Sequence, residues 1–277
     1  MSGKLFVVGT PIGNLSDFSP RAIETLSQVD FIAAEDTRVT IKLLNKFNIS
    51  TPMVSYHKYS TNERGEEICA RIENGENCAI VTDAGMPCIS DPGELLVKEC
   101  AERGIQICAV PGPTALATAV AISGLPTGRF AFEGFLSVNK PSRREHLISL
   151  IREKRTMVFY EAPHKLSATL RDMLQYFGDR RISIVRELTK VHEEVIRTTL
   201  AEAAEKYSDD SIKGEIVLVI EGCHEEEKKD STLEEAVNTA RELAQTGMSL
   251  SDAARESAKL TGFKKGEIYK LLLNDKA

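Results

Sequence analysis

Short apolar and β-branched runs recur along the first 110 positions, and segments with helical periodicity separate them. These runs predict strands at Leu5–Val8, Phe31–Ala34, Met53–Ser55, Ala79–Thr82 and Gln106–Val110. The pair Ser19-Pro20 is a helix start signal, because serine caps a helix and proline suits its first position. Strands that alternate with helices in this way are typical of an α/β fold with a mostly parallel sheet.

The pattern changes after residue 126. A second set of strands is predicted at Phe130–Phe135, Met157–Tyr160, Ile182–Val185, Glu194–Thr198 and Ile216–Ile220. The third and fourth of these flank one short loop, so we expect antiparallel as well as parallel pairing. A charged segment over 225–231 precedes three predicted helices. We therefore expect an N-terminal α/β domain over 1–120, a C-terminal α/β domain over 121–224 and a helical tail over 232–277.

Composition narrows the functional classes. The net charge of -6 argues against a wholly basic nucleic-acid clamp, so any nucleic-acid surface must be a local basic patch. The six cysteines form no C-x-x-C pair and no histidine stands at metal-ligand spacing from them, so we expect no metal. The longest apolar run, Ala115 to Ile122, is too short to span a bilayer, and no N-terminal signal is evident. We expect a cytoplasmic protein without a membrane segment.

Three glycine- and proline-rich loops follow predicted strands of the first half: 9–14 (GTPIGN), 82–87 (TDAGMP) and 111–114 (PGPT). Each alone would be read as a tight connection between a strand and a helix. Ligands of open α/β sheets bind at the carboxyl ends of the strands, however, and three such loops at one edge favour a binding site. The loops match neither G-x-G-x-x-G nor a P-loop, which argues against dinucleotide and nucleoside triphosphate sites.

Eight segments then support a resemblance. In order they are LFVVGTPIGNLSD, AAEDTR, VTDAGMPCISDPG, VPGPTA, FEGFL, FYEAPHKL, RELTK and KGEIVLVIEG, and they extend from about Lys4 to Gly222. Together they resemble the bacterial enzymes that 2′-O-methylate a cytidine ribose in small-subunit (16S) ribosomal RNA, a group within the tetrapyrrole-methylase superfamily. The resemblance implies a two-domain, non-Rossmann α/β homodimer that binds S-adenosylmethionine between its domains.

The resemblance also implies which residues touch the cofactor. They are Pro11, Ile12, Asp83, Gly85, Met86, Ile89, Thr114, Ala115, Tyr160, Leu188, Glu215 and Ile216. The Asp83 carboxylate is a candidate partner of the cofactor's ammonium, and backbone N–H groups after Pro113 are candidates to hold its carboxylate. Because a sulfonium methyl group is already electrophilic, catalysis would rest mainly on positioning.

Candidate catalytic residues are Asp36, Arg38 and His57, which follow the second and third strands. Asp36 is read equally well as a helix cap or as a group near the acceptor ribose. His57 is a candidate base, although a lone histidine in a polar loop is more often a surface residue. Glu161 and Glu187 end strands of the second half, and either one could face the cleft.

Two basic segments are candidate RNA contacts. Residues 138–155 hold six Lys/Arg against two Glu, and Lys140, Arg143 and Arg144 are its candidates for binding phosphate. The tail, with Lys264 and Lys265 after a glycine-containing turn, resembles a helix-turn-helix. A solvated helix face and a plain helical hairpin are the structural alternatives.

Ribosomal RNA or the small ribosomal subunit is thus the expected partner. One competing function is methylation of a tetrapyrrole or a protein side chain by the same fold. Another is a non-catalytic RNA-binding protein that has lost its cofactor, but the intact loops 82–87 and 111–114 speak against it.

Overall fold

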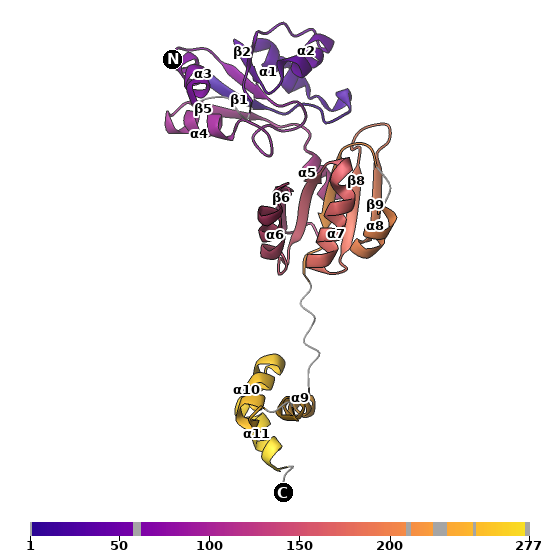
Figure 1. Cartoon of the computed structure of the whole chain (residues 1–277). Helices are drawn as coiled ribbons and strands as arrows, with labels where there is room; N and C mark the ends of the chain where they lie inside the picture. Colours follow the sequence, from indigo (N-terminus) through magenta and orange to yellow (C-terminus); the bar gives the residue numbers. More distant parts are fainter. Residues whose placement is uncertain (1, 58–61, 209–211, 224–231, 246–247, 275–277) are drawn as a thin grey trace. The chain divides into compact units, whose positions relative to one another are not determined.

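The computed structural model describes the chain except residues 1, 58–61, 209–211, 224–231, 246–247 and 275–277 (Figure 1). The chain forms two compact units, Met1–Cys223 and His224–Ala277. The first unit contains both sheets, and the expected boundary at 120/121 lies inside helix α5 (Ala115–Ile122). The charged segment 225–231 lies outside the described residues.

The first sheet is entirely parallel and has the strand order β3-β2-β4-β1-β5. Its strands are β1 (Lys4–Val8), β2 (Phe31–Ala34), β3 (Met53–Ser55), β4 (Cys78–Val81) and β5 (Gln106–Val110). The five strands predicted from the sequence are confirmed to within one residue at each end. Its helices are α1 (Pro20–Gln28), α2 (Thr37–Lys46), α3 (Asn62–Glu73) and α4 (Glu94–Glu102).

Both faces of this sheet are buried, as expected for parallel strands. Successive side chains of β2 point to opposite faces. Phe31 joins a core cluster with residues of α3 and α4, and Ile32 joins another with residues of α1 and α2. Local signals position two of these helices: Ser19 caps α1 ahead of Pro20, and Asp36 caps α2.

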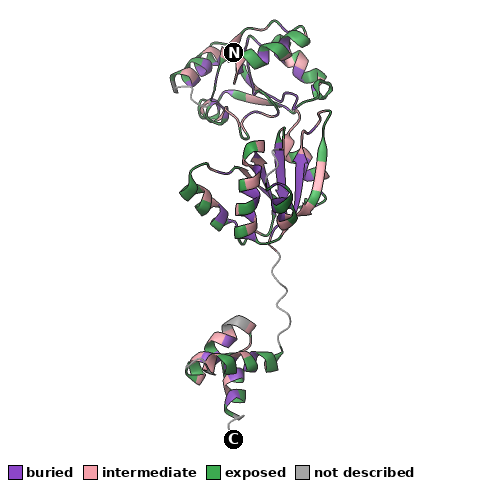
Figure 2. Cartoon of the chain, turned by 45° about the vertical axis from the view of Figure 1, so that its right-hand side comes forward, coloured by how far each residue is buried: buried purple, intermediate pink, exposed green. Residues whose placement is uncertain are grey.

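The second sheet mixes pairings and has the order β6-β7-β10-β8-β9. Its strands are β6 (Phe130–Phe135), β7 (Thr156–Glu161), β8 (Arg181–Arg186), β9 (Glu194–Thr199) and β10 (Ile216–Ile220). The expected mixture is confirmed, because β6 and β7 pair in parallel while the other neighbours are antiparallel. Figure 2 shows the buried strands of this sheet in purple.

Helices cover this sheet on both faces. The helices α6 (Lys140–Ser149), α7 (Leu166–Phe177) and α8 (Leu200–Lys206) contribute to one core cluster. Helix α5 packs in another cluster, where Ala119 and Val120 join Val158, Val217 and Val219. Two short 3-10 turns complete the unit, η1 (Leu15–Asp17) and η2 (Pro163–Lys165). Helix α5 thus carries the chain from the last loop of the first sheet onto a face of the second.

The unit His224–Ala277 contains the three expected helices, α9 (Leu233–Gln245), α10 (Leu250–Thr261) and α11 (Lys265–Asn274). Its core consists of its own residues, including Ala236, Ala240, Ala254, Ile268 and Leu272. Helix α10 ends at Gly262, whose φ of 81° lies in the left-handed region that glycine adopts readily. None of the described helices is both long enough and apolar enough to cross a membrane.

Candidate functional site

Backbone hydrogen bonds hold the loops after β1, β4 and β5 together. Thr10 and Gly85 exchange two of them, with N···O distances of 2.9 and 3.2 Å. The Thr10 hydroxyl donates to the carbonyl oxygen of Thr82 at 3.2 Å, and the Gly9 N–H donates to that of Val110 at 3.1 Å. The three loops predicted to carry the site therefore form one platform at the carboxyl edge of the first sheet.

Two glycines allow this close approach. A Cβ atom added to Gly9 would lie 2.7 Å from the Cα of Gly112, closer than real Cβ atoms come to other atoms. Gly85 has a φ of 91°, a conformation that other residues rarely adopt. The glycines of these loops are therefore required by backbone contact and backbone conformation.

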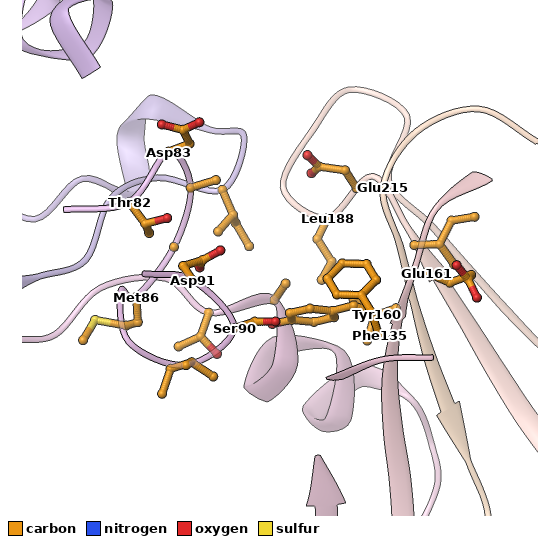
Figure 3. A pocket seen from close by; sticks show the side chains of 18 of the residues that line it. Thr82, Asp83, Met86, Ser90, Asp91, Phe135, Tyr160, Glu161, Leu188 and Glu215 are labelled. Carbon is orange, nitrogen blue, oxygen red and sulfur yellow. The ribbon is translucent and has the colours of Figure 1, made fainter. Parts of the chain in front are cut away.

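The platform forms one wall of a cavity of about 420 Å³ within the unit Met1–Cys223, and the second sheet supplies the other wall. Figure 3 shows Asp83 and Asp91 on the first wall and Tyr160 and Leu188 on the second. The lining includes Ile12, Asp83, Gly85, Met86, Ile89, Thr114, Ala115, Tyr160, Leu188, Glu215 and Ile216. Pro11, the remaining residue expected to bind the cofactor, lines an adjoining groove. The structure thus brings the expected set together, and its binding role stays a prediction.

Tyr160 connects the two walls. Its ring makes edge-to-face contacts with Phe132 and Phe135, at centroid distances of 4.9 and 5.5 Å. Its hydroxyl accepts a hydrogen bond from the N–H of Leu116, in the first turn of α5, at 3.1 Å. The next N–H, of Ala117, donates to the hydroxyl of the capping residue Thr114 at 3.1 Å. These two N–H groups can therefore hold a ligand carboxylate only by giving up their present partners.

Carboxyl groups gather on the first wall. The Thr82 hydroxyl donates to Glu35 at 2.5 Å, and Asp83 and Asp91 line the same cavity. Burial and, to a smaller extent, the nearby Glu35 carboxylate together raise the pKa of Asp91 to about 6. Burial and Glu35 also raise the pKa of Asp83. A wall with several carboxyl groups favours a cationic ligand. Among the described residues, no cluster of side chains suited to hold a metal ion occurs.

A hydrogen-bonded chain runs behind the second wall. Buried Glu161 lines the cavity and accepts a 2.5 Å hydrogen bond from the Thr169 hydroxyl. That hydroxyl accepts from the Arg143 guanidinium at 2.8 Å, and Arg143 also pairs with Asp172 at 2.6 Å. The Arg143 side chain is only 14% exposed. Arg143 thus forms a structural ion pair, whereas Lys140 and Arg144 are exposed. The expected RNA contacts of all three stay predictions.

The candidate catalytic residues lie outside the cavity wall. Asp36 caps α2 and binds Arg38 with an O···N distance of 2.6 Å, so the guanidinium lowers the pKa of Asp36 to about 2 and makes it a weak base. Asp36 still touches the site through its N–H, which donates to Asp83 at 3.3 Å. His57 is exposed and follows β3, which lies at the opposite end of the sheet from β5, whereas the cavity loops follow β1, β4 and β5. It stands at the same edge of the sheet as those loops, as predicted, because the carboxyl ends of parallel strands meet there, but it does not line the cavity. Its role as a base stays a prediction.

The loop after β8 is strained and joins the site to the first loop. Glu187 and Thr189 have positive φ values of 52° and 64°. The Thr189 hydroxyl accepts from the N–H of Asn14 at 3.1 Å, and Lys190 pairs with Glu187 at 2.8 Å and with Glu215 at 3.1 Å. Strain in residues other than glycine is often kept at functional sites. Glu187 thus stabilises the loop through its ion pair with Lys190 and does not line the cavity.

Several lining residues were not singled out from the sequence, among them Ser90, Asp91 and Phe135. Ser90 and Asp91 stand in the segment VTDAGMPCISDPG, and Phe135 stands in FEGFL. The segments were therefore the available signal, but nothing in them showed which side chains turn inward.

Lys264 and Lys265 are exposed in the unit His224–Ala277, at the start of α11. The Lys265 ammonium donates to the Ser251 hydroxyl at 3.0 Å. Both remain candidate RNA contacts.

Comparison with known proteins bears on both units. A family profile for tetrapyrrole (corrin/porphyrin) methylases matches residues 4–204, and one described as the RsmI C-terminal HTH domain matches residues 231–276. A protein of Synechocystis sp. named ribosomal RNA small subunit methyltransferase I is 46% identical, over 98% of each chain. The Thermotoga maritima protein of the same name is 50% identical, over 79% of this chain and 99% of its own.

Solved structures show the same fold at low sequence identity. The uroporphyrin-III-C-methyltransferase of Thermus thermophilus superposes with a TM-score of 0.56 at 17% identity, over 79% of this chain and 94% of its own. Diphthine synthase superposes with a TM-score of 0.59 at 12% identity, over 79% of this chain and 90% of its own. The two-sheet architecture and the sequence matches agree: the chain belongs to the tetrapyrrole methylase family.

Proposed function

We propose that the chain transfers a methyl group from S-adenosylmethionine to the 2′ oxygen of a cytidine ribose in small-subunit ribosomal RNA. One observation carries the proposal: the three loops and the second sheet enclose a single cavity, whose wall includes eleven residues that the resemblance assigns to the donor. The names of the two relatives support ribosomal RNA as the acceptor.

The cavity fits such a donor in size and charge. Its volume of about 420 Å³ lies within the ~300–1,000 Å³ that small-molecule sites span. The donor carries an ammonium and a sulfonium, which suit a wall that holds Asp83 and Asp91. A solved relative, the uroporphyrin-III-C-methyltransferase of Thermus thermophilus in complex with S-adenosylhomocysteine, superposes with a TM-score of 0.54 at 18% identity, over 78% of this chain and 97% of its own. At this identity the likeness supports the fold alone.

When bound, S-adenosylmethionine supplies an electrophilic methyl group. The protein must orient the donor and exclude water: Asp83 is placed to accept its ammonium, and Tyr160 and Leu188 supply apolar surface. The ribose hydroxyl must lose its proton as its oxygen is methylated. Asp91 is the wall residue best matched to accept that proton, because a carboxyl with a pKa of about 6 is both ionised and basic near neutral pH.

We further propose that the two sheets act as two domains around the cavity and that the helical unit assists RNA binding. We also propose that the enzyme works in the cytoplasm and forms a homodimer. The exposed lysines Lys264 and Lys265 support the role of the helical unit. The exposed apolar side chains of Ile89 and Leu95 support burial against a second copy. Sedimentation of the purified protein tests the dimer.

The decisive test is methyl transfer from labelled donor to small subunits, and to naked 16S ribosomal RNA, from a strain that lacks this protein. We expect incorporation at one cytidine, resistant to alkaline cleavage because the ribose 2′ oxygen is blocked. Label on a base or a protein, or transfer to a tetrapyrrole alone, would overturn the proposal. Failure to bind S-adenosylhomocysteine would instead favour an RNA-binding protein without catalysis.

A further inference from the structure

A second cavity of about 410 Å³ adjoins the first. The two share Ile12, Asp83, Ala84 and Glu215 in their walls. The outer lining of the second cavity includes Lys42 and Lys46 from α2 and Lys190 from the loop after β8. We call this second cavity the α2 groove. Its wall includes Pro11 of the expected donor set besides the shared residues, but its lysines do not belong to that set.

The lysines of α2 follow from the helix period. Arg38, Lys42 and Lys46 are spaced by four residues and so share one side of the helix, while Thr40 and Leu44 are its buried residues. Helix α2 contains no acidic side chain over Thr37–Lys46. Its exposed side is therefore a stripe of positive charge.

The three lysines of the groove differ in how their charge is neutralised. Lys190 is held by Glu187 and Glu215, at 2.8 and 3.1 Å. Lys42 and Lys46 are exposed, and neither takes part in an ion pair among the residues that the structure describes. Arg38, one turn before Lys42, is neutralised by Asp36. The charge available to a ligand in the groove therefore belongs to Lys42 and Lys46.

The two cavities also differ in the sign of charge that they favour. Asp83 and Glu215 stand in the wall that both cavities share, whereas Asp91 lines the first cavity alone, so the first cavity is the one that suits a cationic donor. The α2 side of the groove is cationic and suits an anion. A ligand that reaches from the groove toward the shared wall at Ile12 and Ala84 would keep its anionic part on α2, away from these carboxylates.

We propose that the α2 groove binds the phosphates of the RNA strand beside the acceptor ribose, with Lys42 and Lys46 as the phosphate contacts. This inference rests on the proposed function and assigns a place to its substrate. Four residues of helix rise about 6 Å, so the two ammonium groups can contact separate phosphates of one strand. Lysine acts as a point charge for phosphate, and the contact requires no particular base.

The test is the double variant Lys42→Glu/Lys46→Glu, assayed on small subunits that lack the methyl group. We expect the KM for subunits to rise on the order of tenfold or more, because two phosphate contacts become repulsive. The kcat at saturating subunits should stay within about twofold, because these lysines position the strand and take no part in the chemistry. The dissociation constant of S-adenosylhomocysteine, measured by calorimetry, should not change.

Two matched variants control for charge and folding. Lys98→Glu/Lys206→Glu makes the same charge change at exposed lysines of α4 and α8 that line neither cavity, and it should leave the KM unchanged. Lys42→Arg/Lys46→Arg keeps the charge and should keep a KM near that of the wild type. For single-stranded RNA the slope of log affinity against log salt should fall by about 1.4 in the Glu double variant, which corresponds to two lost contacts.

The outcomes separate this inference from the proposed function. An equal KM for the Lys42→Glu/Lys46→Glu variant and the Lys98→Glu/Lys206→Glu control overturns the proposed phosphate contacts. So does a loss of S-adenosylhomocysteine binding that occurs in the Lys42→Glu/Lys46→Glu variant and not in the control. Wild-type protein that methylates no ribose in the subunit overturns the proposed function instead, whatever the double variants do.

Discussion

The hydroxyl of Tyr160 on β7 accepts a hydrogen bond from the N–H of Leu116 in the first turn of α5, at 3.1 Å. The bond ties a strand of the second sheet to the helix that follows the third loop of the first sheet. Burial raises the pKa of Tyr160, so the phenol stays neutral. The position of one cavity wall is therefore coupled to the position of the other.

Replacement of Tyr160 by phenylalanine removes this bond and keeps the ring. We expect the free energy of unfolding to fall by about 0.5–1.5 kcal/mol, the usual net worth of one hydrogen bond. S-adenosylhomocysteine should bind several-fold more weakly because the first turn of α5 loses its anchor. Urea unfolding and calorimetry measure the two effects. Tyr176→Phe on α7 is the control, and an equal effect there would contradict the coupling.

Alanine at Gly9 tests the close approach of the first and third loops. The new methyl group would lie 2.7 Å from the Cα of Gly112, so the backbone must move. Overpacking of this kind costs about 1–3 kcal/mol of stability. Gly128→Ala is the matched control, because nothing lies within 4 Å of its Cβ position. Equal melting temperatures for the two variants would show that the contact is dispensable.

Arg143 and Arg144 are neighbours in sequence but differ in environment. Arg143→Ala removes the pair with Asp172 and the donor to Thr169, and should lower the free energy of unfolding by about 1.5–3 kcal/mol. Arg144 is exposed, so Arg144→Ala should change stability by less than about 0.5 kcal/mol. Denaturant unfolding of both variants checks this. A larger loss at Arg144 would reverse the assignment.

The sequence pattern predicted the strands of both sheets almost residue by residue, because buried strands need continuous apolar runs such as Ile216–Ile220. It did not supply the strand order. Strand pairing joins residues that are distant in sequence, so the pattern placed His57 at the loop edge of the sheet but did not show that β3 is separated from β1 by two other strands.

Within the site, too, local features could be predicted from the sequence and long-range ones could not. The three loops could be predicted because their glycines and prolines are local signals. The inward position of Asp91 depends on the fold of its loop against Thr82 and Glu35. The exposure of Phe135 depends on the irregular pairing of β6 with β7 near Gly134. Likewise, nothing local distinguishes the largely covered Arg143 from the exposed Arg144.

Removal of the helical unit after Cys223 should leave a folded protein, because that unit builds its core from its own residues. The Thermotoga maritima relative, whose match covers 99% of its own length but only 79% of this chain, agrees with this expectation. We expect unchanged affinity for S-adenosylhomocysteine and weaker binding to small subunits. Calorimetry and a filter-binding assay measure the two. Equal affinity for subunits would remove Lys264 and Lys265 from the RNA contacts.

Asp91 should make both stability and catalysis depend on pH. Its pKa of about 6 in the folded protein lies above the 3.8 of an ordinary aspartate, so the folded state binds the proton more tightly. The group's stabilising contribution is therefore present at low pH and is lost as the pH rises through about 4 to 6. The melting temperature of Asp91→Asn, relative to the wild type, should increase across this window. A constant difference would show that Asp91 has an ordinary pKa.

Catalysis should respond in the opposite direction, because a base must be ionised to accept the ribose proton. We expect kcat for methyl transfer to rise with pH through about 6 and then level, if Asp91 accepts the proton. Asp91→Asn should lower kcat by about 10²–10⁴-fold. It should also abolish the rise of kcat with pH, since asparagine does not titrate. Single-turnover rates on small subunits between pH 5 and 8 provide the measurement. If kcat of the variant rises with pH as in the wild type, Asp91 is not the base, because some other group must then be titrating.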